Sequence, residues 1–89
     1  MSALTPQDAE ILRVLCNVGF IGKRPTRRHC VDLVFFTRMS RTTVDKRLQH
    51  MKGEGLIEDD GEYRHRLYWA TDAGMAALAA WASEHGGEG

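Results

Sequence analysis

The chain has 89 residues, of which 43% are apolar and 27% charged, so its length and composition indicate one globular domain and exclude a disordered protein. Its apolar runs fall short of the roughly 20 residues that cross a bilayer, and two cysteines are too few for a disulfide framework. We expect a cytoplasmic protein with reduced thiols, one domain over residues 1–85, and a flexible tail at 86–89.

Positive and negative charges are separated along the chain, although the formal net charge is zero. Residues 23–52 hold nine cations and two acids, a net charge of +7, whereas the other residues hold three cations and ten acids, a net charge of −7. Such a separation gives the protein one face that suits a polyanion. Charges scattered only for solubility would not usually divide so completely.

The segment LTPQDAEILRVLCNVGF predicts a first helix that begins with a capping box. Thr5 is placed as the N-cap, Pro6 suits the first turn, and Asp8 occupies the acidic third position. An apolar stripe follows at helical spacing, formed by Ile11, Leu12, Leu15 and Val18. Gly19 and Gly22 then end the helix.

A second, short helix is expected after Pro25, with Thr26 as its cap. Its buried side is predicted to consist of Cys30, Leu33 and Val34, with Phe36 as a further candidate. Ser40 then caps a third helix, SRTTVDKRLQHMKG, whose core residues at helical spacing are Val44, Leu48 and Met51. Only residues 37–39 separate the two helices, which is the length of the turn in a helix-turn-helix.

Beyond Gly55 the period changes to that of strands, and Asp60-Gly61 marks the turn of a hairpin. On the second strand Tyr63, His65, Leu67 and Trp69 share one face, and Arg64, Arg66 and Tyr68 share the other. Thr71 and Asp72 begin a last helix. Its predicted apolar side is Met75, Leu78, Ala79 and Ala82.

Two segments resemble winged helix-turn-helix bacterial regulators of the MarR, PadR and ArsR kind. VDLVFFTRMSRTTVDKRLQHMKGEGLIE is similar to their turn, recognition helix and first wing strand, and RLYWATDAGMAAL is similar to their second wing strand and closing helix. The resemblance implies a mainly α fold with a three-helix core, a two-stranded wing and a C-terminal helix. It also implies DNA binding as a small transcriptional regulator, a repressor.

The third helix has an outer face opposite its core residues. With Val44 at 0° and about 100° per residue, Leu48 and Met51 lie within about 40° of it, whereas Thr42, Lys46 and Gln49 lie at about 140–200°. Arg41 lies at the N-terminal end of the helix, which points into the groove in helix-turn-helix docking. The residues predicted to contact bases in a major groove are Arg41, Thr42, Lys46 and Gln49. Those predicted to contact the DNA backbone are Lys23, Arg24, Arg27, Arg28, Arg38, Ser40, Thr43, Arg47, Arg64 and Arg66. For Arg64 and Arg66, pairing with acids on the sheet is an equal alternative.

The predicted wing tip, EDDGE, argues against a simple DNA-binding protein, because phosphates repel acids. Either the wing points away from DNA or this face meets a protein partner. The alternative function is therefore a winged helix that binds proteins and does not read DNA, such as an adaptor or a small phage-type inhibitor. Binding of single strands has little support, because the outer strip of the third helix lacks aromatic side chains.

The sequence carries no phosphate-binding loop, dinucleotide fingerprint or paired zinc-ligand spacing, and no nucleophile has a recognisable activating partner. We therefore expect no enzyme, no cofactor and no metal, and Cys16 and Cys30 are interpreted as small core or near-core residues. The last helix either packs on the first helix or forms a homodimer interface together with it. The dimer hypothesis assigns this interface to Met75, Leu78 and Trp81.

Overall fold

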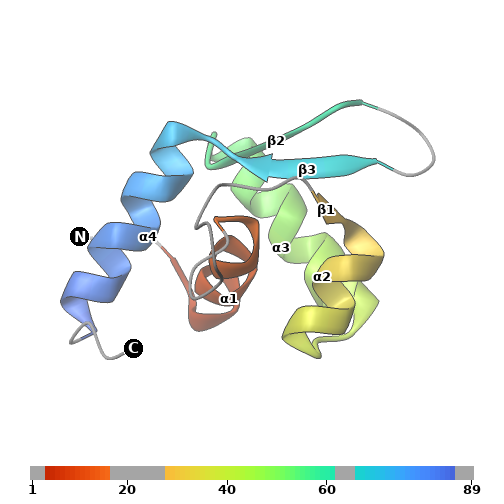
Figure 1. The fold of residues 1–89 in the computed structure, drawn as a ribbon, viewed down its shortest axis with the longest axis horizontal. Coiled ribbons are helices and arrows are strands. Elements are labelled where there is room, and N and C mark those ends of the chain that lie inside the picture. The colour runs from red at the N-terminus through yellow and green to blue at the C-terminus, as the bar shows by residue number, and fades with distance from the viewer. Residues whose placement is uncertain (1–3, 17–27, 62–65, 86–89) are drawn as a thin grey trace.

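The computed structural model describes residues 4–16, 28–61 and 66–85. The elements in these ranges are α1 (Pro6–Leu15), β1 (Arg28–His29), α2 (Cys30–Thr37), α3 (Arg41–Gly53), β2 (Ile57–Asp59), β3 (Leu67–Ala70) and α4 (Asp72–Glu84). Helix α1 lies between α4 on one side and α2 with α3 on the other, and the sheet runs along one edge of the helices (Figure 1). This arrangement confirms the predicted winged helix-turn-helix.

Helix α1 begins with the predicted capping box. Thr5 Oγ1 accepts a hydrogen bond from Asp8 N at 3.1 Å, and Asp8 Oδ2 accepts one from Thr5 N at 3.2 Å. The two bonds satisfy backbone donors that the first turn of a helix leaves free. The helix ends at Leu15, earlier than predicted, and Cys16 is its C-cap; Val18, Gly19 and Gly22 lie outside the described residues.

The start of α2 differs from the sequence prediction. Arg28 pairs with Tyr68, and His29 with Leu67, so the chain is still extended at His29 and the helix begins at Cys30. The N-cap is therefore His29 and not Thr26, and His29 N donates to Asp32 Oδ2 at 3.2 Å. The strand pairing also makes the predicted two-stranded wing a three-stranded antiparallel sheet with the order β1-β3-β2.

The core lies between the three helices α1, α2 and α3 and the inner face of the sheet. Its most deeply buried apolar residues are Ile11, Leu12, Leu15, Leu33, Val44, Leu48, Met51 and Ile57. Phe36 is 42% exposed, so its prediction as a core residue is wrong. On β3 the side chains alternate as expected, with Tyr68 and Ala70 buried, and burial raises the pKa of the Tyr68 hydroxyl.

Helix α4 is rotated relative to its predicted orientation. Gly74 and Leu78 face the core, whereas Ala79 and Ala82, which we expected on the packed side, are exposed. The reason lies in the first turn of α4, where Gly74 packs so tightly under the Leu56 carbonyl that a Cβ would overlap its oxygen. Positions 78 and 81 follow Gly74 at i+4 and i+7 and thus lie on the same side. None of the helices in the three described ranges is long and apolar enough to cross a membrane.

Candidate nucleic-acid interface

Helix α3 is a capped helix with one buried and one exposed face. Ser40 Oγ accepts a hydrogen bond from Thr43 N at 3.1 Å, which confirms the predicted N-cap. On the buried face the exposed fractions are 0% for Val44, 1% for Leu48 and 0% for Met51. The four predicted base-contacting residues, Arg41, Thr42, Lys46 and Gln49, are all exposed. Thr42, Lys46 and Gln49 lie opposite the buried face, and Arg41 is exposed at the N-terminal end of the helix; we call these four residues the α3 strip.

The end of α3 is fixed by a glycine turn that joins it to the wing. Gly55 has a φ of +77°, a left-handed conformation that favours glycine. Gly55 N donates to Lys52 O at 3.1 Å, and Leu56 N donates to Met51 O at 2.9 Å. This pair of bonds is the Schellman motif. It explains the sequence GEGLI, because the turn delivers Ile57 to the core as the first residue of β2.

One acid lies beside the α3 strip, and it is engaged on both oxygens. Cys30 Sγ, at the start of α2, donates to Asp45 Oδ1 at 3.2 Å, and Arg41 Nε lies 4.0 Å from Asp45 Oδ2. Burial, followed by the interaction with Asp45, raises the pKa of the Cys30 thiol to about 11, so the thiol keeps the proton that it donates. The sequence pattern does not reveal this contact, because the cysteine and the carboxylate belong to different helices.

Arg47, one of the predicted DNA-backbone contacts, pairs with a buried acid. Its guanidinium lies 3.5 Å from the carboxylate of Asp8, whose side chain is 1% exposed, and the Arg47 side chain itself is 25% exposed. This ion pair connects α3 to the capped end of α1. A phosphate that binds Arg47 would therefore compete with Asp8 for the guanidinium. The loss of Arg47 would leave the buried Asp8 carboxylate unpaired, which is costly.

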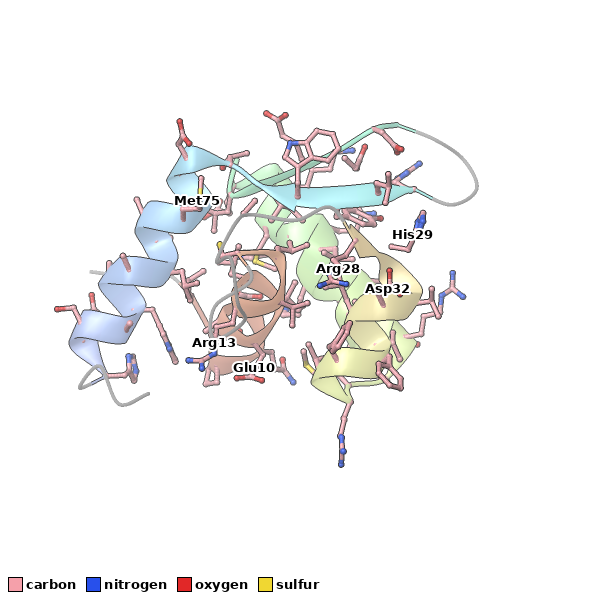
Figure 2. The ribbon with its side chains drawn as sticks, viewed as in Figure 1. Glu10, Arg13, Arg28, His29, Asp32 and Met75 are labelled. Carbon is pink, nitrogen blue, oxygen red and sulfur yellow. The ribbon has the colours of Figure 1, made fainter. Side chains whose placement is uncertain are left out.

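The other described backbone-contact candidates surround α2 and the start of α3. Arg28, in β1, is half-buried, and its guanidinium lies 5.0 Å from the centroid of the Phe36 ring. Arg38, at the end of α2, is exposed, and the Ser40 and Thr43 hydroxyls are bonded to each other at 2.9 Å. Figure 2 shows Arg28 and Asp32 at the first turn of α2. Four further candidates, Lys23, Arg24, Arg27 and Arg64, lie outside the described residues.

Two acids of the acidic wing, Asp59 and Asp60, form ion pairs or hydrogen bonds within the chain. The Asp59 side chain is only 4% exposed. Its Oδ2 atom lies 2.8 Å from Lys52 Nζ and 3.9 Å from Arg66 Nη1. The Lys52 ammonium, above all, holds the pKa of this carboxyl below its ordinary value. Asp59 Oδ1 also accepts from Gly61 N at 2.8 Å, and Asp60 Oδ1 accepts from Leu67 N at 3.2 Å. Two acids of the EDDGE segment therefore stabilise the hairpin, and Arg66 pairs on the sheet as the alternative reading expected.

The three residues that the dimer hypothesis names are packed within the chain. Leu78 is 7% exposed in the core, while Met75 and Trp81 are partly buried against it. The Trp81 ring stacks on the ring of His85, with their centroids 3.6 Å apart. Packing of α4 within its own chain, the alternative to a dimer interface, is thus what the structure contains at these positions. Figure 2 shows Met75 near the start of α4.

Possible ligands for a metal do not converge within residues 4–16, 28–61 and 66–85, where no group of three His, Cys, Asp or Glu side chains could hold an ion. Cys16 and Cys30 are free thiols, each partly buried against the core, in agreement with their interpretation as near-core residues.

Solved structures with the same fold include a transcription regulator and proteins that bind DNA, by their descriptions, whereas no family model and no curated protein matches the sequence. A MarR family transcription regulator superposes with a TM-score of 0.75 at 23% identity, over 93% of this chain and 52% of the other. Bordetella bronchiseptica BpsR, whose DNA binding is regulated by 6-hydroxynicotinic acid, gives 0.74 at 22% identity, over 90% and 58%. TubR from Bacillus thuringiensis serovar israelensis, bound to 24 bp of tubC, gives 0.72 at 14% identity, over 86% and 80%. The chain thus spans little more than half of the first two proteins.

Proposed function

We propose that this protein binds double-stranded DNA as a small transcription regulator and inserts α3 into the major groove. The observation that carries the proposal is the α3 strip, in which four hydrogen-bonding side chains are exposed on a helix whose opposite face is buried. An arginine at the N-terminal end of such a helix, as Arg41 is, can bond guanine through two N–H groups, and Gln49 can bond adenine in the same way. Thr42 and Lys46 complete the base contacts.

The phosphate contacts in this proposal are the cations and hydroxyls next to the helix-turn-helix in the sequence, together with Arg64 of the wing. Arg28, Arg38, Ser40 and Thr43 surround the helix-turn-helix, and Lys23, Arg24, Arg27 and Arg64 remain predicted contacts. The engagement of Asp59 supports the proposal, because its charge is offset by Lys52 and Arg66 and repels phosphate less than the sequence alone suggests. The DNA-bound TubR, with the same fold, supports it too.

We further infer a cytoplasmic repressor without enzymatic activity that acts as a homodimer through its N- and C-terminal helices. Because Leu78 is already in the core, such an interface would use the outer sides of Met75 and Trp81. Two copies related by a two-fold axis would read an inverted repeat.

A salt titration tests the proposal directly. A duplex selected from a random library is labelled, and its binding by the full chain is followed by fluorescence anisotropy from about 50 to 200 mM salt. About six phosphate contacts predict a log–log slope of about −5. The double variant Arg41→Ala, Lys46→Ala should lose about tenfold or more in affinity, because each good base contact contributes about 1–3 kcal/mol.

The matched control is Arg13→Ala, which removes a cation from the last turn of α1, where the proposal places no DNA contact. It should leave affinity and slope unchanged. A flat salt response, or equal affinity of the double variant and the parent protein, would reject DNA binding and favour the alternative function as a protein-binding module.

A further inference from the structure

The large exposed apolar side chains of the described residues all lie on α2. Val31 is 64% exposed, Phe35 75% and Phe36 42%. Val31 and Phe35 are one turn apart, on the side of α2 opposite Leu33, and the Phe35 ring meets the Phe36 ring edge-on with centroids 5.3 Å apart. We call these three residues the α2 patch. Helix α2 lies at the margin of the molecule, on the side away from α4 (Figure 1).

The α2 patch is not required by the core of the protein. Leu33 is fully buried, and Cys30 and Val34 pack partly against the same core, so α2 is anchored by its other face. Leaving a phenylalanine in water forgoes about 1.5–3 kcal/mol of transfer free energy. Contiguous exposed apolar side chains on a small protein therefore mark an interaction site more often than a single exposed leucine does.

Two cations lie beside the Phe36 end of the α2 patch. The Arg28 guanidinium lies over the Phe36 ring, and Arg38 is exposed where the helix ends. Neither arginine forms an ion pair within the part of the chain that the structure describes. The acid of α2, Asp32, accepts a hydrogen bond from His29 N and belongs to the helix cap. A complementary surface would be apolar opposite Val31 and Phe35 and would carry acids near these two arginines.

A second copy of this chain does not offer that surface. Its exposed acids in the described ranges, such as Glu58, Asp72 and Glu84, lie on elements without a large exposed apolar side chain. Two α2 patches placed face to face would bring Arg28 and Arg38 of both copies together, and like charges across an interface are unfavourable. A stable interface between folded proteins buries roughly 800 Å² per partner. The three side chains of the α2 patch are too few to supply an interface of that size.

Unpaired nucleic-acid bases fit less well than a protein segment. Bases stack on free aromatic faces. Arg28 covers the Phe36 ring, the Phe35 ring meets it at 81°, and Val31 has no ring to stack on.

We propose that the α2 patch binds a short amphipathic helix of a partner protein. Its apolar side chains, one turn apart, pack on Val31 and Phe35, and its acidic side chains pair with Arg28 and Arg38. This binding mode is a helix laid on an apolar surface. Val31 and Phe35 lie outside the α3 strip, whereas Arg28 and Arg38 are shared with the proposed phosphate contacts, so a bound peptide and a bound duplex would compete for these two arginines.

A displayed library of random 16-residue peptides, selected on the immobilised full chain, tests the proposal. Counter-selection uses the double variant Val31→Ser, Phe35→Ser, which should fold normally because both side chains are exposed; its thermal midpoint checks this. We expect enriched peptides with apolar residues at i and i+4 flanked by Asp or Glu. Synthetic copies should bind the parent chain at least about tenfold more tightly than the double variant, a difference of about 1.4 kcal/mol.

Two further variants separate the components of the interaction. Arg28→Gln with Arg38→Gln should weaken binding of the acidic peptides and flatten its salt dependence. Ala76→Ser with Ala80→Ser, on the exposed side of α4, should change nothing. Enriched peptides without acids, or equal binding to the parent and to the Val31→Ser, Phe35→Ser variant, would overturn the proposal. So would self-association, or binding of oligo-dT, that the Phe35→Ser change abolishes, because the occupant would then be a second copy or a single strand.

Discussion

Arg38 ends α2 in a conformation that arginine rarely adopts. Its φ of 60° and ψ of 19° lie in the left-handed region, where a residue with a Cβ is less stable than glycine by about 1 kcal/mol. Helices more often place glycine at such an end. Among the described residues Arg38 is the one non-glycine with positive φ. Strained residues concentrate at functional sites, which supports a role for its guanidinium in binding.

Replacing Arg38 with glycine should therefore have opposite effects on stability and affinity. We expect the free energy of unfolding to rise by about 0.5–1 kcal/mol, measured by urea denaturation, because the strain is relieved. Duplex affinity should fall, and the salt slope should decrease by about 1, because one phosphate contact is lost. Arg38→Lys, which keeps both the charge and the strain, should change neither quantity appreciably. If Arg38→Gly retains full affinity and slope, Arg38 does not contact DNA.

At the scale of elements, Gly74 decides how α4 joins the domain. Its Cα lies against the Leu56 carbonyl, which also accepts a hydrogen bond from Thr71 N at 3.0 Å. Thr71 Oγ1 in turn accepts from Gly74 N at 3.1 Å as the helix cap. The glycine of the sequence TDAG thus has a steric reason, namely the close approach of α4 to the backbone that follows α3.

Alanine substitution at two helical glycines should separate this steric role from helix propensity. Gly74→Ala should destabilise the protein by about 2–3 kcal/mol, because the new methyl group meets a backbone oxygen that cannot move aside. Gly53→Ala, also helical but with open space around its Cα, should leave stability unchanged or raise it by up to about 1 kcal/mol. Urea denaturation of both variants measures the difference. Equal stabilities would show that α4 can shift away from Leu56.

At the scale of the whole molecule, Asp59 joins α3 to the strands β2 and β3 of the sheet. Its carboxylate on β2 pairs with Lys52 near the end of α3 and with Arg66 beside β3. The folded state therefore holds the pKa of Asp59 below its ordinary value of 3.8. A carboxyl with a lowered folded-state pKa adds stability above its unfolded pKa and loses that contribution as the pH falls through its folded pKa.

Asp59→Asn should accordingly lower the free energy of unfolding at neutral pH and flatten its dependence on pH below about 4. The two proteins should become similar in stability as the pH approaches about 2, where the parent carboxyl is also protonated. Urea denaturation at pH 7, 5, 3 and 2 measures this. Glu58→Gln, at the exposed neighbouring position, is the control and should follow the parent protein. A parent and an Asp59→Asn variant with parallel pH profiles would contradict the assigned ion pairs.

The fold was predictable wherever its signals are local in the sequence. The Thr5–Asp8 capping box and the Ser40 cap depend on residues three apart, and the apolar spacing of α3 identifies its buried face. The start of α2 was not predictable in this way, because the partner of Arg28 in the sheet is Tyr68, forty positions later. The rotation of α4 depends likewise on contact with Leu56, which its own apolar pattern does not encode.

The candidate site was predictable to the same degree. The exposure of Thr42, Lys46 and Gln49 follows from helical periodicity, and that of Arg41 follows from its place at the first residue of α3. The partners of individual charges do not follow from periodicity. Arg47 meets Asp8 and Lys52 meets Asp59 only after the elements pack, and a count of charges in the sequence treats these ion-paired residues as free.

The glycine turn after α3 has a mechanical consequence. Leu56 donates its N–H to α3 at Met51 and accepts, through its carbonyl, the N–H of Thr71 at the start of α4. The Thr71 hydroxyl adds a bond to Gly55 O at 2.7 Å. Helix α3 and the start of helix α4 are thus both hydrogen-bonded to the same short segment, Gly55 and Leu56. A change in the tilt of α4 should therefore move the C-terminal end of α3 as well. The orientation of α4 is thus coupled to that of the helix that carries the α3 strip.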